Sequence, residues 1–228
     1  MLTESFSGDL EFLYNKLKNK DKFSFSKYAD GEYAILRGQT ITNCDNWTFD
    51  ATKHDYVRRQ LMESFTYKDD GYYVGISCPC CQPRPHIDWM RSMVQSNMTW
   101  ANIFVNSNHP FYVEKFIPEY SKHDVILFSR EDSKLQNLPF KIEKHIPISR
   151  TAFVDNFDLV NFFPVEEYTN KLFLFCAGPL GNMLAAKFWE KNITNTYLDI
   201  GSTLNAYLTE PNRGYLLGSQ DTYKTCVW

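Results

Sequence analysis

Hydrophobic and polar positions follow their clearest pattern between residues 171 and 201. Residues 172–177 form an uninterrupted apolar run, which is typical of a strand that is covered on both faces. The tight turn 178–181 (Gly-Pro-Leu-Gly) follows, and apolar residues up to Trp189 then have the spacing of a helix. Residues 196–201 again have the pattern of a strand. A strand, a glycine turn, a helix and a strand within about thirty residues form a βαβ unit, whose two strands pair in parallel.

Strand-like and helix-like segments also alternate before this unit. Apolar residues have helical spacing in the stretches 8–20, 52–66, 86–98, 111–120 and 155–163. Short apolar or alternating runs lie between them, at 23–25, 72–76, 103–105, 124–128 and 141–148. The segment 33–36 fits either the opening of a helix or a second extended piece. The repeated order predicts an α/β fold, a single Rossmann-like domain with a mostly parallel sheet flanked by helices.

Length and composition agree with one globular domain. The chain has 228 residues, of which 43% are hydrophobic and 16% aromatic, so it can bury a substantial core without disulfide bonds. We expect one domain over residues 1–228, with a core at about 8–208 and a C-terminal tail, 209–228, that packs on it. No run reaches the roughly 20 apolar residues of a membrane span, and the N-terminus lacks a signal-peptide pattern. These observations predict a cytoplasmic protein.

Charged residues of both signs are interspersed along the chain. The 24 Lys and Arg residues and the 27 Asp and Glu residues give a net charge of −3. This balance argues against nucleic-acid binding through a basic face. A few local Arg and Lys residues would still be sufficient to hold a small acidic ligand.

The motif Asp30-Gly31-Glu32 places two carboxylates on either side of a glycine, directly after the alternating run at 23–25. Burying two unpaired carboxylates side by side is unfavourable. A divalent cation that also holds a phosphate would remove the conflict, because hard oxygen ligands suit Mg²⁺ and Mn²⁺. The alternative is an Asp-Gly turn with an exposed glutamate, which is a common structure.

Further polar residues follow the other predicted strands, and ligands of open parallel sheets bind at the C-terminal ends of the strands. The set is Asp30, Glu32, Ser77, Cys78, Ser129, Arg130, Ser149, Arg150, Gly178, Asp199 and Gly201. Two arginines, an acidic pair and a glycine turn would suit a diphosphate with a metal. Each member alone also has a structural explanation, such as a solvated arginine, a turn glycine or a helix cap. The turn at 178–181 is neither a dinucleotide-binding fingerprint nor a Walker loop.

Six cysteines are present, three of them at Cys78, Cys80 and Cys81 with His86 close behind. No matching second cysteine pair accompanies this cluster, so reduced thiols near a loop are favoured over a zinc site. The five histidines show no metal-ligand spacing. His109 lies in a polar stretch where it could act as a base.

Several segments together resemble a known family. Residues 28–32 (Tyr-Ala-Asp-Gly-Glu) are similar to the aromatic-Gly-Asp-Gly-Glu motif of the GT-D glycosyltransferases, formerly a domain of unknown function. Residues 100–104 resemble its Gly-Asn-Ala-Phe region, and residues 148–153 its Pro-Ser-Lys-Asn-Ala-Phe segment. Residues 176–185, followed by 198–201, resemble its Leu-Gly-Pro-Thr-Ala and Asp-Ile-Gly pair. The similarity spans about 25–205.

The resemblance implies a nucleotide-diphosphate sugar as substrate, with Asp30 and Glu32 as the catalytic acidic pair and the ligands of Mn²⁺ or Mg²⁺. The residues it implies for substrate binding, together with those at the predicted strand ends, are Tyr28, Gly31, Asn102, Arg130, Ser149, Arg150, Gly178, Pro179, Asp199 and Gly201. Arg150 stands where the family has lysine, a change that keeps the charge. The chain departs from the family in Ala29, which replaces glycine, and in Ser202, where the family continues with histidine. If that histidine sets donor or acceptor choice, this chain uses a different substrate.

The leading hypothesis is a metal-dependent glycosyltransferase that moves a hexose or deoxyhexose from a nucleotide-diphosphate sugar, UDP-linked in first preference, to a glycan acceptor. An inverting enzyme also needs a base, and the candidates are Asp88, His109, Asp155 and Glu210. A nucleotide or nucleotide-sugar hydrolase and a non-catalytic nucleotide-sugar-binding module are the alternatives. No nucleic-acid partner and no membrane span are expected, and a homo-oligomer is compatible with the sequence.

Overall fold

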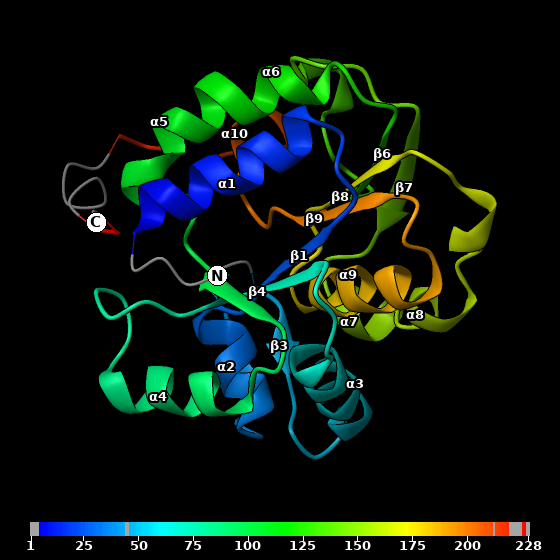
Figure 1. The fold of residues 1–228 in the computed structure, drawn as a ribbon. Helices are drawn as coiled ribbons and strands as arrows, with labels where there is room; N and C mark the ends of the chain where they lie inside the picture. The colour runs from blue at the N-terminus through cyan, green and yellow to red at the C-terminus, as the bar shows by residue number, and fades with distance from the viewer. Residues whose placement is uncertain (1–4, 44–45, 212, 219–224, 227–228) are drawn as a thin grey trace.

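A computed structural model of the protein describes residues 5–43, 46–211, 213–218 and 225–226. Within them, seven strands form one sheet in the order β5-β4-β1-β9-β8-β6-β7 (Figure 1). The strands are β1 (Ser24–Lys27), β4 (Tyr72–Ile76), β5 (Asn97–Trp100), β6 (Val125–Arg130), β7 (Lys144–Ile148), β8 (Leu172–Phe175) and β9 (Thr196–Asp199). Every neighbouring pair is parallel. The predicted α/β fold with a mostly parallel sheet is confirmed.

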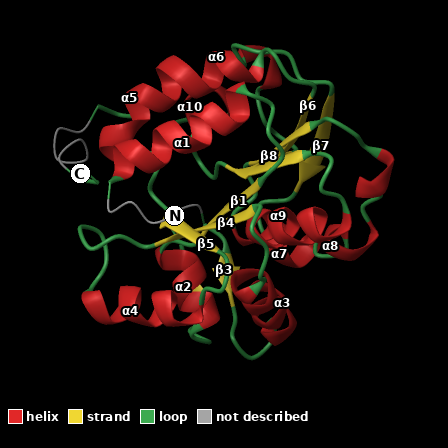
Figure 2. Ribbon diagram, viewed as in Figure 1, coloured by secondary structure: helices red, strands yellow, loops and turns green. Residues whose placement is uncertain are grey.

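Helices cover both faces of the sheet (Figures 1 and 2). One face carries α1 (Phe6–Lys18), α5 (His109–Phe111), α6 (Ile117–Tyr120) and α10 (Asn205–Leu208). A π-helical stretch, Tyr112–Phe116, joins α5 to α6. The other face carries α2 (Asp30–Leu36), α3 (Asp55–Thr66), α4 (Arg84–Met93), α7 (Ala152–Asp155), α8 (Leu159–Phe162) and α9 (Pro179–Lys191). Single 3₁₀ turns lie at Asn106–Asn108, Leu135–Asn137 and Val165–Glu167.

The apolar run of β8 supplies a hydrophobic core on each face of the sheet. Leu172 and Leu174 belong to the core under α1 and α6, whereas Phe173 and Phe175 belong to the core under α9. Successive side chains of a strand point to opposite faces, so an uninterrupted apolar run is what a strand buried on both faces requires. The sequence signal and the packing therefore have the same cause.

The alternation of Phe and Ser at 23–26 explains how α9 reaches the centre of the sheet. Phe23 and Phe25 fill the core on the α1 face. The small Ser24 faces α9 instead, and its hydroxyl donates to the Ala185 carbonyl oxygen at 2.8 Å. On the same side, Asn182 donates its amide N–H to the Ser26 hydroxyl at 3.1 Å and to the Lys27 carbonyl oxygen at 2.5 Å. Serines on this face of β1 thus let a helix backbone lie close to it.

Three predicted elements differ from the structure. The helix expected over 86–98 ends at Met93, and residues 97–100 form edge strand β5 instead. The apolar run 103–105 is a turn whose Ile103 and Phe104 are buried, so its hydrophobicity reflects packing and not strand formation. The helix expected over 155–163 is two short helices, α7 and α8. A small antiparallel hairpin, β2 (Ile41–Thr42) with β3 (Thr48–Phe49), was not predicted.

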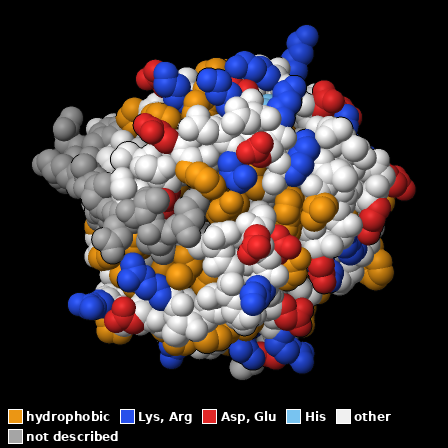
Figure 3. Space-filling view, in the orientation of Figure 1, with side chains coloured by type: hydrophobic (Ala, Val, Ile, Leu, Met, Phe, Trp, Pro, Cys, Tyr) orange, Lys and Arg blue, Asp and Glu red, His pale blue; other side chains and the backbone are white. Residues whose placement is uncertain are grey.

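The distribution of surface charge and the lengths of the helices bear on whether the protein binds nucleic acid or spans a membrane. Lysine and arginine side chains are mixed with aspartate and glutamate on the face shown in Figure 3. Among the described helices, none is both long enough and apolar enough to span a bilayer. The predicted tail, 209–228, lies partly outside the described residues, which include its buried Tyr215 and Cys226.

Candidate functional site

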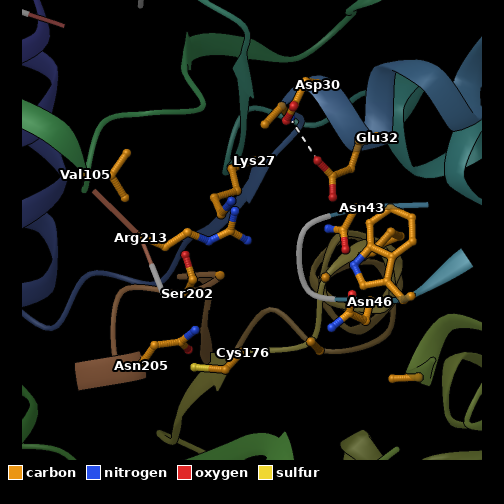
Figure 4. A pocket seen from close by; sticks show the side chains of 18 of the residues that line it. Lys27, Asp30, Glu32, Asn43, Asn46, Val105, Cys176, Ser202, Asn205 and Arg213 are labelled. Carbon is orange, nitrogen blue, oxygen red and sulfur yellow. Dashed lines mark hydrogen bonds between the residues drawn. The ribbon is translucent and has the colours of Figure 1, made fainter. Parts of the chain in front are cut away.

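A cleft of about 1280 Å³ runs along the C-terminal edge of the sheet. Residues at or just after the ends of all seven strands line it, from Lys27 at the end of β1 to Gly201 after β9. Figure 4 shows the cleft from close by, with side chains from distant segments converging on it. Binding sites for small molecules commonly have about 300–1000 Å³, so this cleft has room for a substrate larger than a single nucleotide. Its position is the one expected for ligands of an open parallel sheet.

Asp30 and Glu32 lie in the first turn of α2, on one wall of the cleft (Figure 4). Asp30 is exposed, whereas Glu32 is only 8% exposed. Glu32 turns back to the helix start, where its Oε2 accepts the N–H of Ala29 at 3.0 Å. Ala29 has no side-chain acceptor of its own, so Glu32 stabilises the N-terminus of the helix. The motif therefore begins a helix, and the Asp-Gly turn with an exposed glutamate, the alternative considered for it, is not present.

Lys27 is a cleft residue that the sequence did not point out. Burial lowers the pKa of its ammonium, but the carboxylates of Asp199 and Glu32 more than offset this effect, and the net pKa is raised. Asp199 lies beneath the cleft surface, where its Oδ2 accepts the backbone N–H of Lys27 at 3.2 Å. Burial raises the pKa of Asp199 to about 7, although Lys27 acts in the opposite direction. Burial also raises the pKa of Glu32.

Two glycines shape the floor of the cleft beside these charges. Gly178 has a φ of 53° at the N-terminus of α9, a conformation that side chains other than glycine rarely adopt. Gly201 has a φ of 52°, and a Cβ there would lie 2.3 Å from Cε of Lys27. Gly201 therefore leaves the space in which the Lys27 side chain lies. Gly178, Pro179 and Gly201, three of the substrate-binding candidates from the sequence, all line the cleft.

The β2–β3 hairpin supplies a further wall through Trp47, a residue the sequence analysis did not select. Its indole is 6% exposed and packs edge-on against Phe153 at 5.1 Å between ring centroids. A Cβ placed on Gly31 would lie 3.3 Å from this ring. Asn43 and Asn46 of the same hairpin also line the cleft (Figure 4). The small exposed part of the indole gives this wall an apolar surface, and the amide groups beside it suit hydrogen bonding to a base or a sugar ring.

Cationic side chains reach the cleft from three further segments. Arg130 pairs with Asp132, and Lys134 donates to Glu210 at 2.6 Å. Arg150 is exposed and has no hydrogen bond or ion pair to another described residue, which leaves its guanidinium available to a ligand. Arg213, near Lys27, also lines the cleft (Figure 4).

Most predicted substrate-binding residues line the cleft, but two do not. Tyr28 is fully buried and its hydroxyl lies 3.2 Å from that of Tyr72, beneath the site. Asp199 is 2% exposed and acts on the cleft through Lys27 and through the Gly201 N–H, which it accepts at 3.2 Å. The predicted residues that do line it are Gly31, Asn102, Arg130, Ser149, Arg150, Gly178, Pro179 and Gly201.

The four base candidates are spread over the molecule. Glu210 lines the cleft, where its hydrogen bond with Lys134 lowers its pKa. Asp88 lies on α4 outside the cleft and pairs with Arg84 at 3.6 Å. Asp155 stands behind Ser149, whose hydroxyl donates to it at 2.6 Å. His109 is packed on Tyr215 at 4.8 Å between rings, and burial lowers its pKa.

The acidic pair fits a magnesium or manganese ion in its chemistry. Asp30 offers an exposed carboxylate, and a carboxylate such as that of Glu32 retains lone pairs beyond its bond to Ala29. Among the described residues, no group of three or more acidic or histidine ligands converges at this end of the cleft. Mg²⁺ is commonly held by one or two carboxylates together with substrate phosphates and water. The pair thus has the composition of a site completed by a diphosphate.

Comparison with known proteins gives a consistent result at the level of the fold. No protein-family model and no curated protein matches the sequence. Three solved structures are similar over 98% of this chain. Two are of domain of unknown function 1792, one described as having a distinct glycosyltransferase fold; each is 13% identical, has a TM-score of 0.62 and is covered over 89% of its length.

The third structure is described as a new glycosyltransferase (DUF1792) from Streptococcus sanguinis. It is 14% identical, has a TM-score of 0.63 and is covered over 92% of its length. The resemblance seen in the motifs is therefore matched by a likeness of the backbone over nearly the whole chain. The protein has the glycosyltransferase fold of the DUF1792 structures.

Proposed function

We propose that this protein is a glycosyltransferase that uses a nucleotide-diphosphate sugar, UDP-linked in first preference, together with Mn²⁺ or Mg²⁺. A hexose or deoxyhexose would pass from this donor to a glycan acceptor. The observation that carries the proposal is the joint placement of Asp30, Glu32 and the Gly178 turn along one cleft of a chain with this fold. Separate segments thus supply groups suited to a metal, a diphosphate and a sugar.

The charges of the cleft support a diphosphate ligand. Asp30 and Glu32 would hold the divalent cation, which when bound neutralises the diphosphate leaving group as the glycosidic bond breaks. Arg150, unpaired among the described residues, would add a guanidinium with two parallel donors for phosphate oxygens. Lys27 is held in its charged form by Asp199 and Glu32 and would supply a further positive charge beside the diphosphate.

The remaining cleft walls support a nucleoside and a sugar. The Nε1 edge of the Trp47 indole lies close to the Gly178 turn, 3.7 Å from the position of a Cβ on that glycine. Asn43, Asn46 and Asn205 supply amide donors and acceptors at different points along the cleft (Figure 4). Neutral polar groups of this kind recognise hydroxyls without competing with the metal for charge.

The test is nucleotide binding by the Asp30→Asn variant, with Asp88→Asn as its matched control. Asp88 is an exposed carboxylate outside the cleft, so its loss removes the same charge elsewhere. Titration of UDP, GDP and dTDP with and without Mn²⁺ should show metal-dependent affinity in the wild type and in Asp88→Asn. Asp30→Asn should lose at least about tenfold in affinity, or about 1.4 kcal/mol, in the presence of Mn²⁺.

Turnover then separates the possible activities. Incubation with a panel of nucleotide sugars should release nucleoside diphosphate, and a glycan acceptor should increase that release as the sugar is transferred. Equal nucleotide and metal binding by Asp30→Asn and the wild type would contradict the site assignment. Binding without turnover of any donor would favour a non-catalytic module, and donor hydrolysis that acceptors never redirect would favour a hydrolase.

A further inference from the structure

Four cysteine side chains from opposite parts of the sequence meet beside the cleft. Cys78, Cys80 and Cys81 lie in the loop after β4, and Cys226 lies near the C-terminus. Their four sulfurs all lie within 4.8 Å of one another. The sequence analysis favoured reduced thiols near a loop over a zinc site, because no second cysteine pair matched the cluster. That interpretation overlooked the two-residue gap between Cys78 and Cys81, and no spacing rule could identify Cys226 as the fourth member.

We propose that the sulfurs of Cys78, Cys80, Cys81 and Cys226 form a structural Zn²⁺ site. In a tetrahedral zinc–thiolate site, Zn–S bonds of about 2.3 Å place the sulfurs about 3.8 Å apart. The sulfur of Cys226 lies 3.7, 3.6 and 3.8 Å from those of Cys78, Cys80 and Cys81, respectively. The remaining distances between Cys80 and its neighbours are 3.1 Å to Cys78 and 3.6 Å to Cys81. Four of these five distances are within about 0.2 Å of the tetrahedral value, so the cluster is close to a preformed zinc coordination shell.

The spacing does not correspond to disulfide bonds. Sulfurs in a disulfide are about 2.05 Å apart, and every measured pair in this cluster is more than 1 Å further apart than that. A tetrahedral set of four sulfurs is typical of zinc or of iron–sulfur chemistry. All four positions are filled by protein ligands, which is the arrangement of a structural zinc and not of a catalytic one.

Two asparagine amides contact the sulfurs from the side of the cleft. Asn102 directs its Nδ2 to the Cys81 sulfur at 3.2 Å, and Asn106 directs its Nδ2 to the Cys226 sulfur at 3.3 Å. Zinc bound to four thiolates retains excess negative charge, and N–H donors to the sulfurs reduce it. Amide donors aimed at sulfur are the second shell that such a site needs. Both asparagines also line the cleft.

The backbone around Cys226 is held in place by the turn at Asn106–Asn108. The Cys226 carbonyl oxygen accepts the Ser107 hydroxyl at 2.8 Å and the Asn108 amide at 3.2 Å. Cys226 has a φ of 62°, a left-handed conformation that is uncommon for residues other than glycine. This conformation directs the Cys226 side chain to the three loop cysteines. A bond to zinc would offset the unfavourable backbone conformation.

The site would have a structural role distinct from the chemistry proposed for the cleft. Cys81, Gln82, Asn102 and Asn106 line one end of the cleft, so zinc would fix that wall. It would also tie the loop after β4 to the C-terminal segment around Cys226. The proposal therefore stands whether or not the cleft binds a nucleotide sugar.

The first test is the metal content of the full-length protein, purified under reducing conditions after expression with zinc. We expect one zinc per chain by elemental analysis, and Co²⁺ in its place should give the visible bands of a tetrahedral thiolate site. Cys226→Ser should lose the metal, and Cys176→Ala, a cysteine outside the cluster, should keep it. Absence of zinc from the wild type, retention of zinc by Cys226→Ser, or iron as the bound metal would each overturn the proposal.

A second test uses the wild type alone, so that misfolding of a variant does not affect it. With zinc bound, iodoacetamide should modify no more than the two cysteines outside the cluster of the six in the chain, and chelation should expose the other four. Chelation should also lower the melting temperature, because metal binding stabilises the folded state alone. Equal alkylation with and without chelator, or an internal disulfide among these cysteines in place of the metal, would contradict zinc binding.

Discussion

Lys27, Glu32 and Asp199 show what the fold does with single charges at the floor of the cleft. Burial alone would favour the neutral form of each group. Because Lys27 lies near both carboxylates, its pKa is raised, whereas burial raises the pKa of Asp199 to about 7 against the opposing effect of Lys27. Such perturbed groups cluster at functional sites, where a ligand completes the charge balance. In this cleft, a cation at Asp30 and Glu32 together with a diphosphate at Lys27 would complete the charge balance.

Asp199 should make the stability of the protein depend on pH. The folded protein holds the Asp199 proton up to about pH 7, whereas the unfolded chain releases it near pH 4. Between these values the folded state binds more protons, so the contribution of Asp199 to the free energy of unfolding falls as pH rises, by up to about 1.4 kcal/mol per pH unit. Asp199→Asn should lack this dependence.

The measurement is urea unfolding of wild type and Asp199→Asn from about pH 4 to about pH 8 without divalent metal. The stability of the variant relative to wild type should increase up to about pH 7 and then level off. Parallel pH profiles for the two proteins would show that Asp199 ionises in the folded protein as it does in the unfolded chain.

Gly201→Ala tests whether the space left by Gly201 matters to Lys27. A Cβ at this position would lie 2.3 Å from Cε of Lys27, so the side chain must move. Gly218→Ala is the matched control, because Gly218 also has a positive φ, 72°, but its Cβ position has no heavy atom of another described residue within 4 Å. Both variants should lose about 1–2 kcal/mol of stability from the backbone conformation. Gly201→Ala alone should also weaken nucleotide binding, by about tenfold.

Thermal unfolding and nucleotide titration of the two glycine variants are sufficient for this comparison. The same nucleotide affinity in Gly201→Ala and Gly218→Ala would mean that the position of Lys27 has no part in binding.

At the residue scale, the sequence selected residues that line the cleft where their place directly after a strand was enough to find them. Asp30, Gly178 and Arg150 follow strands and line the cleft. Lys27 was missed, although it lies on the same face of the strand as Phe23 and Phe25. A charged residue in a row of buried positions could have indicated a functional site. Cys226 could not be found, because only the folded backbone brings it to the loop after β4.

At the element scale, the close packing of α9 against β1 depends on a small residue at position 24. Ser24 is fully buried, and its hydroxyl donates to the Ala185 carbonyl oxygen across the contact. Ser24→Leu should force the helix away from the strand and destabilise the protein by about 1–3 kcal/mol from overpacking, in addition to the lost hydrogen bond. Ser24→Ala removes only that bond and should lose about 1 kcal/mol.

Urea unfolding of both Ser24 variants would check this prediction. If Ser24→Leu is no less stable than Ser24→Ala, the contact between α9 and β1 has space for a large side chain. The prediction that this contact requires a small residue at position 24 would then be wrong.

Elements were predicted well where one physical signal dominated. The strand at 72–76 and the unit 171–201 were found because both faces of their strands are buried. The helix expected over 155–163 is interrupted after Asp155, and there the Asn156 side-chain oxygen accepts the N–H of Ser149, seven residues earlier, at 2.8 Å. The β2–β3 hairpin was missed because each of its strands has only two residues.

At the scale of the whole molecule, the sheet brings distant segments to one edge. All strands run in the same direction, so their C-terminal ends meet along the cleft, and loops from the whole described chain contribute to it. The fold could be predicted, because each strand-and-helix unit has its own sequence signal. The order β5-β4-β1-β9-β8-β6-β7 could not, because it depends on pairings between strands far apart in the sequence.

The place of β1 in that order has a consequence for how the protein folds. β1 pairs with β4 on one edge and with β9 on the other, with Ser24 opposite Tyr197. β1 and β9 are far apart in the sequence, and pairing such strands requires the closure of a long loop. This makes folding slow compared with that of proteins built from local contacts. During synthesis, β1 keeps an open edge until residues 196–199 have left the ribosome, and open strand edges promote aggregation. The cleft is therefore among the last features to form.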